Sequence, residues 1–159
     1  MKTKVRRFRI SIAGIALLSG VLLIPGTVSA QTNVPDLLSS VPKTVVLDPI
    51  TGQIISVTAG SIATTSSAIT PDISHRNNVC QTTSPVDFCY YGHSPYANQG
   101  FYGSAGTWYN TWYQRYAFET GAYTGHACWN MSICSQNFGE NTYVTFGGST
   151  VTGTSVTII

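Results

Sequence analysis

The segment from Phe88 to Trp129 holds fourteen aromatic residues in forty-two positions, and Arg115 and Glu119 are its only formally charged residues. Aromatic side chains favour strands and gain much free energy on burial, while Tyr and Trp also carry a polar tip that suits a wet contact surface. A domain of this size cannot bury all of them, and a group of exposed aromatic side chains usually binds something. The segment therefore predicts an all-β binding module without naming its ligand.

The first thirty residues have the order of a secretory signal. A basic start (Met1–Arg9) precedes an apolar run (Ile10–Ile24) and the small-residue pattern Val28–Ala30. A retained membrane anchor is the alternative, but the apolar run is short for a span of ~20 residues. We therefore expect a signal peptide over residues 1–30, cleavage after Ala30, and a secreted protein with no membrane span after cleavage. Association with the cell envelope stays open.

Removal of this segment reverses the sign of the net charge. Five of the eight basic residues lie in the signal, which leaves three cations against six carboxylates, a net charge of −3. Three cations are too few to bind a phosphate backbone, so we expect no nucleic-acid partner. The composition also differs from that of cationic peptides that lie on anionic membranes.

Four cysteines, Cys80, Cys89, Cys128 and Cys134, all lie in the exported part. An even count in an oxidising compartment indicates two disulfides, for which three connectivities are possible. We favour Cys80–Cys89 and Cys128–Cys134, because each pair closes a short loop beside the aromatic segment. Zinc ligands usually stand closer together than these pairs do. We therefore expect neither a metal nor another cofactor.

The exported chain divides into an N-terminal segment (31–58), a Ser/Thr-rich linker (59–72) and a main β domain (73–159). In the first, the β-branched runs Thr44–Leu47 and Gln53–Thr58 flank Asp48–Gly52, whose Asp, Pro and Gly residues predict the turn of a hairpin. The hairpin is either a separate lobe or an additional pair of strands on the main sheet. In the main domain we expect strands at Asp87–Tyr91, Thr107–Tyr113, Arg115–Thr120, His126–Trp129, Thr142–Phe146 and Val151–Ile158.

Two segments resemble the βγ-crystallin module and the small secreted actinobacterial peptidase inhibitors that share its fold. One is the aromatic strand and glycine of Phe88–Gly100, and the other is the Asn-to-Ser turn Asn130–Ser135 with the strand that follows it. Together they cover under a third of the chain. The resemblance implies a bacterial host and a crystallin-like fold. Together with the disulfides and the hairpin expected from the residues, the predicted fold is a disulfide-bonded antiparallel β-sandwich with an N-terminal β-hairpin appendage. Met131 and Cys134 depart from the pattern of the calcium-binding turn, so calcium binding is not implied.

The aromatic residues at the centre of the segment are the candidate binding site: Trp108, Tyr109, Trp112, Tyr113 and Tyr116. Strand alternation places Trp108, Trp112 and Tyr116 on one face and the two other tyrosines on the opposite face. We expect one face to be core and the other either a binding surface or a merely half-covered face. An exposed aromatic face can stack on a sugar ring, with Asn110 and Gln114 bonding to hydroxyls, or can anchor a protein partner.

An enzyme is the competing hypothesis. His93, Arg115, Glu119 and His126 are the residue types of a small secreted ribonuclease, but a single arginine is a poor phosphate site. We favour a structural interpretation, in which Arg115 and Glu119 form a weak surface ion pair. No hydrolase signature is present, and we expect no catalytic residues.

The sequence therefore predicts a secreted, non-enzymatic binding module for an extracellular protein or a cell-envelope glycan. Peptidase inhibition is the most specific version of this prediction. An antimicrobial or toxin-like protein that acts on the envelopes of competitors is the first alternative, and the ribonuclease-like enzyme is the second. The oligomeric state is open, because the aromatic face could also pair two copies.

Overall fold

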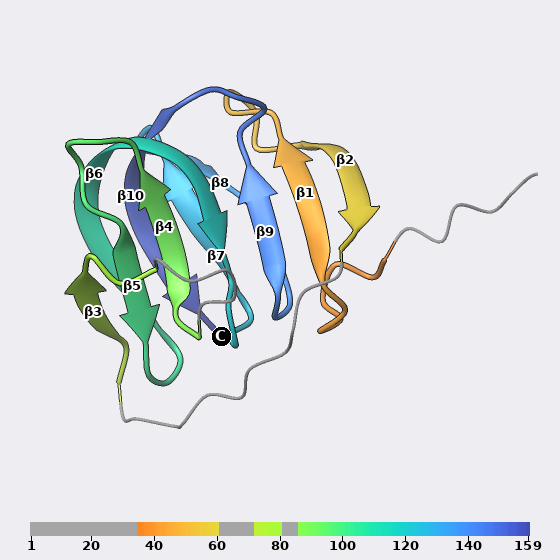
Figure 1. The fold of residues 1–159 in the computed structure, drawn as a ribbon, viewed down its shortest axis with the longest axis horizontal. Helices are drawn as coiled ribbons and strands as arrows, with labels where there is room; N and C mark the ends of the chain where they lie inside the picture. Colours follow the sequence, from red (N-terminus) through yellow and green to blue (C-terminus); the bar gives the residue numbers. More distant parts are fainter. Residues whose placement is uncertain (1–34, 61–71, 81–85) are drawn as a thin grey trace, which may run out of the picture. The chain divides into compact units, whose positions relative to one another are not determined.

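The computed structural model describes residues 35–60, 72–80 and 86–159, and these residues form strands and turns without a helix (Figure 1). The predicted signal and most of the predicted linker lie outside the described residues. The strands are β1 (Lys43–Leu47), β2 (Ile54–Ala59), β3 (Ser74–Asn77), β4 (Phe88–Gly92), β5 (Gln99–Tyr102), β6 (Gly106–Glu119), β7 (Gly125–Trp129), β8 (Ile133–Cys134), β9 (Thr142–Thr145) and β10 (Val151–Ile158). The prediction of an all-β chain is confirmed.

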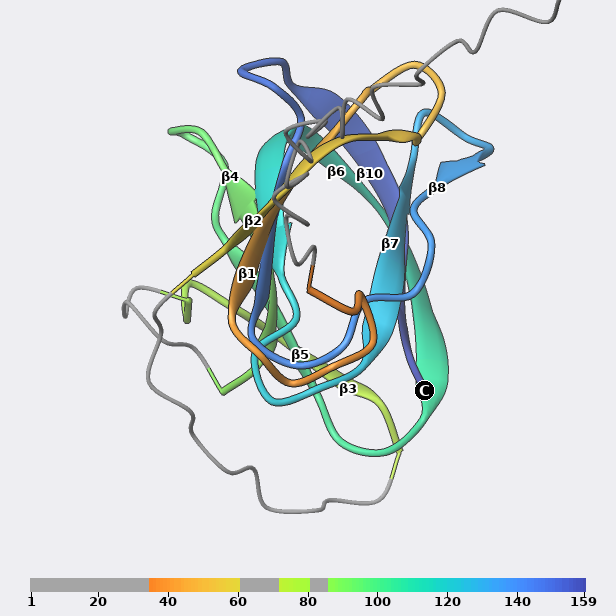
Figure 2. The same ribbon diagram turned by 90° about the vertical axis from the view of Figure 1, so that its right-hand side faces the viewer.

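The strands form one curled, mixed sheet. Its main path runs β2-β1-β9-β6-β10-β7-β8, while β4 pairs with both β5 and β6, and β3 pairs with β5. The pair β1–β9 is parallel, and the other pairs between the described strands are antiparallel. Figure 2 shows the curl from the side, with β1, β2 and β4 on one side and β7, β8 and β10 on the other.

Strand β6 is the long element that connects the two sides. Its last residues pair with β4 and β9, and the rest of the strand pairs with β10. The register shifts at several points, and Gln114 has a positive φ of 56°. Such bulges bend a strand and increase its twist. We predicted two strands separated at Gln114, whereas the structure has one strand that bulges there.

The two N-terminal strands belong to the same sheet as the rest of the described chain. β1 pairs with β2 on one side and with β9 on the other. The turn between β1 and β2 is held by Asp48, whose Oδ1 atom accepts hydrogen bonds from the backbone N–H groups of Ile50 (2.7 Å) and Thr51 (3.3 Å). Trp129 donates its indole N–H to the carbonyl of Pro49 (2.7 Å). Of the two alternatives left by the sequence, the hairpin is thus the additional pair on the main sheet rather than a separate lobe.

Gly52 allows this turn to lie against the β7–β8 hairpin. Its φ is +73°, and a Cβ atom there would lie 2.8 Å from the carbonyl oxygen of Cys134. A larger residue would therefore be strained in its backbone and would also push the two hairpins apart.

The core lies inside the curl and is mostly aromatic and β-branched. Its buried members are Val45, Leu47, Phe88, Tyr90, Phe101, Trp112, Phe118, Ala127, Trp129, Phe138, Val144, Phe146, Val151, Val156 and Ile158. A second, smaller cluster contains Cys80, Cys89, Tyr91 and Ala117, with Val79, Tyr116 and Tyr143 packed against it. The aromatic segment thus supplies side chains to both clusters.

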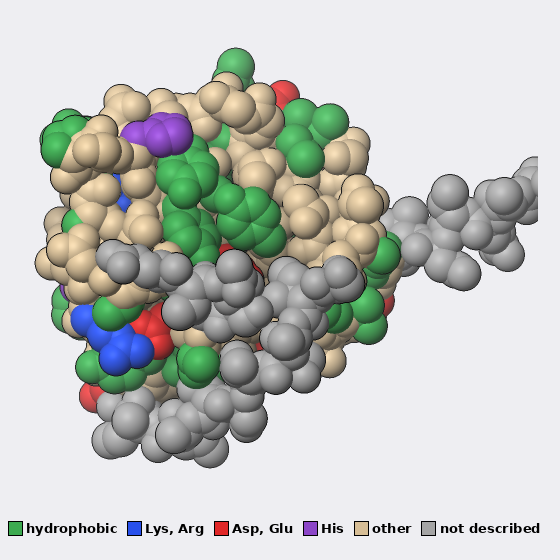
Figure 3. Space-filling view, viewed as in Figure 1, with side chains coloured by type: hydrophobic (Ala, Val, Ile, Leu, Met, Phe, Trp, Pro, Cys, Tyr) green, Lys and Arg blue, Asp and Glu red, His purple; other side chains and the backbone are tan. Residues whose placement is uncertain are grey.

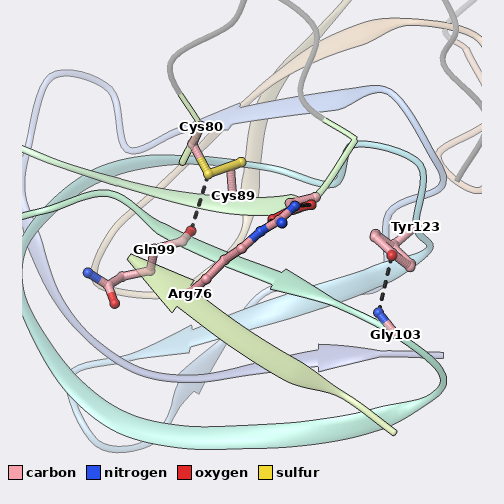
Figure 4. Close-up of polar contacts among 7 residues, drawn as sticks. Arg76, Cys80, Cys89, Gln99, Gly103 and Tyr123 are labelled. Atoms are coloured by element: carbon pink, nitrogen blue, oxygen red, sulfur yellow. Dashed lines mark hydrogen bonds and ion pairs between the residues drawn. A yellow bond between two sulfur atoms is a disulfide. The ribbon is translucent and has the colours of Figure 1, made fainter. Parts of the chain in front are cut away.

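The two favoured disulfides, Cys80–Cys89 and Cys128–Cys134, are confirmed. The second joins directly opposed residues of β7 and β8. Figure 4 shows the first, with the Sγ atom of Cys80 pointing at the carbonyl oxygen of Gln99 on β5 at 3.5 Å. The first disulfide therefore ties the chain that follows β3 to β4, beside β5.

Candidate binding site

The structure divides the five aromatic residues of the candidate site among three environments. Trp112 is 5% exposed and belongs to the main core. Trp108 is half-buried and packs against that core. Tyr109 and Tyr113 are 76% and 54% exposed. Tyr116 is half-buried against the second cluster. Only the two exposed tyrosines are therefore available to an external ligand over most of their surface.

The bulges of β6 explain why Tyr116 does not share a face with the two tryptophans. Trp112 pairs with Gly153 and Arg115 pairs with Val151, so three steps along β6 match two steps along β10 and β6 has one extra residue between Trp112 and Arg115. An extra residue of this kind reverses the side to which the following side chains point. The simple alternation used for the prediction was therefore wrong at Tyr116, because it assumes a strand without bulges.

Tyr96, which we did not predict, joins the exposed pair. Its ring centroid lies 6.0 Å from that of Tyr113, with the ring planes at 51°, and the side chain is 41% exposed. The turn that carries it is closed by a hydrogen bond from the N–H of Tyr96 to the carbonyl of His93 (2.9 Å) and is joined to β6 by one from the N–H of His93 to the carbonyl of Gln114 (3.1 Å). We call Tyr96, Tyr109 and Tyr113 the tyrosine surface.

The residues interleaved with the tyrosine surface are polar and uncharged. Asn110, Thr111 and Gln114 are exposed on β6. The Oδ1 atom of Asn110 accepts a hydrogen bond from the N–H of Thr111 (2.8 Å), which leaves the amide N–H₂ group to donate. The site therefore combines flat apolar rings with amide and hydroxyl groups, on a strand whose backbone is held by β10.

A second aromatic group lies over β4, β6 and β9. Figure 3 shows hydrophobic side chains gathered over these strands beside a histidine. The ring of Tyr91 contacts those of Tyr116 (6.1 Å between centroids) and Tyr143 (5.9 Å), and His93 stacks on Tyr116 at 4.5 Å. These rings pack against one another, so they form a surface cluster rather than separate platforms.

A buried carboxyl group, that of Glu119, lies under this second group. Its Oε2 atom accepts a hydrogen bond from the hydroxyl of Tyr91 (2.8 Å). Burial raises the pKa of Glu119, and the hydrogen bond from Tyr91 opposes that rise. Burial also raises the pKa of the Tyr91 hydroxyl, and the neighbouring carboxylate raises it further.

Arg115 has a structural role. It is 1% exposed, and its guanidinium donates hydrogen bonds to the carbonyls of Tyr113 (2.9 Å), Tyr90 (3.1 Å) and Ala97 (2.8 Å). A Cβ atom at Gly92 would overlap the guanidinium. The predicted surface ion pair between Arg115 and Glu119 was therefore wrong, because backbone carbonyls hold the arginine inside the fold.

Of the other residues of the ribonuclease hypothesis, His93 and Glu119 adjoin the second aromatic group, and the two histidines have partners of their own. His126 places its Nδ1 atom 2.7 Å from Oδ1 of Asn137, and His93 stacks on Tyr116. Each side chain thus has partners of its own.

The other two cations that follow the predicted signal, Lys43 and Arg76, are also bonded to protein groups. Lys43 is buried and donates from Nζ to the carbonyl of Ser39 (2.6 Å) and to Oγ1 of Thr142 (3.3 Å), and burial lowers its pKa. Arg76, shown in Figure 4, forms a bidentate ion pair with Asp87 at 2.7 and 2.6 Å and lies over the ring of Tyr102.

No protein-family model matches the chain, and neither a curated protein nor a solved structure gives a match. Within residues 35–60, 72–80 and 86–159, no group of three or more His, Cys, Asp or Glu residues is placed to hold a metal ion. The same part of the chain contains no helix that is long and apolar enough to cross a membrane.

Proposed function

We propose that this protein is a secreted, non-enzymatic binding module that holds an extracellular ligand, a cell-envelope glycan or a protein, on its tyrosine surface. The observation that carries the proposal is the exposure of Tyr109 and Tyr113, 76% and 54%, on a single strand, next to Tyr96. Together they concentrate exposed aromatic area in one place, and such concentrations on soluble proteins usually mark interaction sites.

The chemistry of tyrosine supports this role. A tyrosine side chain offers a large rigid area with few rotatable bonds, so ordering it against a ligand costs little conformational entropy. Its hydroxyl remains hydrated in the free protein and can form a hydrogen bond in the complex. The backbone pairing of β6 with β10 also holds the rings in place before the ligand arrives, which favours binding.

Secretion is part of the proposal. Both disulfides support it, because such bonds persist in oxidising compartments and are rare in the cytosol. The order of residues in the first thirty positions supports it independently.

The crystallin-like sandwich and peptidase inhibition remain predictions from the resemblance. The curled sheet is compatible with a two-sided architecture, and the long β6 is the strand that would join the two halves. If the protein is a peptidase inhibitor, the capture experiment described below is expected to retain a secreted peptidase.

The test is capture of envelope material and secreted proteins from the native culture by the purified, oxidised protein. The double variant Tyr109→Ala/Tyr113→Ala is expected to lose the captured ligand while keeping its melting temperature. Ile50→Ala/Met131→Ala is the matched control, because it removes two exposed apolar side chains, 78% and 93% exposed, outside the tyrosine surface. If both double variants capture as well as the parent, the tyrosine surface is not the binding site.

Retention on insoluble wall material would indicate a glycan, and capture of one soluble protein would indicate a protein partner. A parent protein that captures nothing and forms a stable dimer, which the tyrosine double variant dissociates, would show that the surface pairs two copies. That result would overturn the proposed function.

A further inference from the structure

We infer that the ligand of the tyrosine surface is an uncharged polysaccharide that lies along β6. This inference rests on the proposed function and names the chemical class of the ligand. It follows from the positions of Lys43, Arg76, Arg115 and Glu119, from the polar groups between the tyrosines, and from the spacing of the rings.

Among the described residues, no Lys or Arg side chain is both exposed and unpaired, so none is free for an anionic ligand. After residue 30 its only Lys and Arg residues are Lys43, Arg76 and Arg115. Lys43 and Arg115 are 0% and 1% exposed and bonded to protein oxygens, while Arg76 is paired with Asp87. Phosphate, sulfate and carboxylate groups are recognised through free cations or bidentate arginine. Nucleic acids, uronic-acid polymers and phosphate-rich wall polymers therefore lack a partner on this surface.

The tyrosine surface also lacks an anion that would recognise a cationic ligand. Residues 93–114, which carry all three tyrosines, contain no Asp, Glu, Lys or Arg. The carboxyl group of Glu119, further along β6, is 6% exposed and bonded to the hydroxyl of Tyr91. A cationic sugar polymer or a basic peptide would therefore find only the ring faces, without a counter-charge.

The groups that are present match an uncharged polyol. The C–H faces of a sugar ring are apolar and can lie flat on a tyrosine ring. Asn110, Thr111 and Gln114 are exposed between and beside the rings. Their amide and hydroxyl groups both donate and accept hydrogen bonds, as sugar hydroxyls require.

The spacing of the rings indicates a polymer. Tyr109 and Tyr113 stand four residues apart on one strand, which corresponds to about 13 Å at ~3.4 Å per residue, slightly less where the strand bulges. A single sugar ring cannot cover both positions. A linear chain that runs along β6 can cover both, and Tyr96 widens the platform at the Tyr113 end.

A protein ligand fits this surface less well. Between residues 93 and 114 the exposed large hydrophobic side chains are the three tyrosines, and the exposed aliphatic ones, such as Ile50 and Met131, lie elsewhere in the described chain. The centre of a protein interface usually combines aromatic anchors with further apolar side chains and arginine.

The decisive experiment compares two soluble polymers that share one backbone and differ in charge. Hydroxyethyl cellulose is neutral and carboxymethyl cellulose is anionic; neutral β-1,3-glucan, mannan and chitin complete the panel. Binding of the purified, oxidised protein is measured by affinity electrophoresis for the soluble polymers and by sedimentation for the insoluble ones. We expect binding to at least one neutral polymer and none to carboxymethyl cellulose.

Three variants and a salt series define the site. Tyr109→Ala is expected to weaken binding about tenfold or more, whereas Tyr109→Phe, which keeps the ring, and the control Met131→Ala are expected to stay within about threefold of the parent. Binding is also expected to be independent of salt between ~50 and ~200 mM, because no counterions are released when a neutral polymer binds.

The outcomes separate this inference from the proposed function. Tyrosine-dependent binding to an anionic or cationic polymer, or to a protein in place of any neutral polymer, would overturn the inference and leave the binding module intact. Capture that is unchanged in the Tyr109→Ala/Tyr113→Ala variant would overturn both.

Discussion

Trp112 and Tyr109 stand three residues apart on the same strand, and the structure predicts opposite consequences when each is shortened to alanine. Trp112 is 5% exposed and contacts the rings of Phe101 and Tyr90 at 5.3 and 6.0 Å between centroids. Truncation of a buried Trp to Ala costs about 3–5 kcal/mol, because it loses the transfer free energy and leaves a cavity. Tyr109 is 76% exposed, so its truncation is expected to change stability by no more than about 0.5 kcal/mol.

A third variant tests the polar atom of Trp112. The indole N–H is buried without a hydrogen-bond partner among the described residues. Trp112→Phe removes this unsatisfied donor, which offsets part of the packing loss, since a buried unsatisfied donor costs about 1–3 kcal/mol. We therefore expect Trp112→Phe to cost well under half as much as Trp112→Ala.

Urea unfolding followed by far-UV circular dichroism measures all three free energies. At about 4 °C per kcal/mol for a domain of this size, Trp112→Ala is expected to lower the melting temperature by about 10–20 °C. If Tyr109→Ala destabilises the protein as much as Trp112→Ala does, the assignment of one residue to the core and the other to the surface is wrong. The result also decides how binding data are interpreted, because lost binding in Trp112→Ala would report unfolding rather than a lost contact.

Three further predictions concern the rest of the fold. Because the pKa of Glu119 is raised above its ordinary value of 4.5 in the folded state, its contribution to the free energy of unfolding is present below pH ~4.5 and falls as the pH rises through the folded pKa. Glu119→Gln is expected to remove this loss of stability at high pH, so that the variant is at least as stable as the parent at pH 7 in urea unfolding. A clear destabilisation of the variant at pH 7 would contradict the raised pKa of Glu119. Replacement of both Cys128 and Cys134 by serine is expected to cost about 2 kcal/mol, the loop-entropy value for a separation of six residues, and an unchanged midpoint would show that this disulfide contributes nothing. Gly153→Ala places a Cβ atom 2.6 Å from the Tyr90 ring and is expected to cost about 1–3 kcal/mol by overpacking, so an unchanged melting temperature would show that the core has spare room there.

The strands with a strong local pattern could be predicted from the sequence. The predicted Val151–Ile158 coincides with β10, and the predicted His126–Trp129 and Thr142–Phe146 differ from β7 and β9 by one residue at one end. Val151–Ile158 and Thr142–Phe146 consist largely of β-branched and aromatic residues, and glycine or polar turns bound them. β3 was missed because its sequence, Ser-His-Arg-Asn, carries no such pattern. It becomes a strand because β5 provides a partner.

The sequence predicted the kind of residue that forms the candidate site, but not which individual residues belong to it. The density of aromatic residues indicated a binding surface on the central strand, and the structure exposes Tyr109 and Tyr113 there. Tyr96 was missed because only the turn after β4 brings it to Tyr113. Tyr116 was assigned to the wrong face because the bulge opposite β10, between Trp112 and Arg115, cannot be predicted from the sequence of β6 alone.

The sequence by itself determined the all-β class and the position of the aromatic strand, and it favoured the cysteine pairing that the structure confirms, since these depend on residue type and on neighbours close in the chain. Only the tertiary structure decided which aromatic residues are core, and it also decided that Lys43 and Arg115 lie inside the fold. The physical reason is that the register of β6 is set by hydrogen bonds to β4, β9 and β10, which come from distant parts of the chain. A shift of one residue in such a register changes the face on which every later side chain lies.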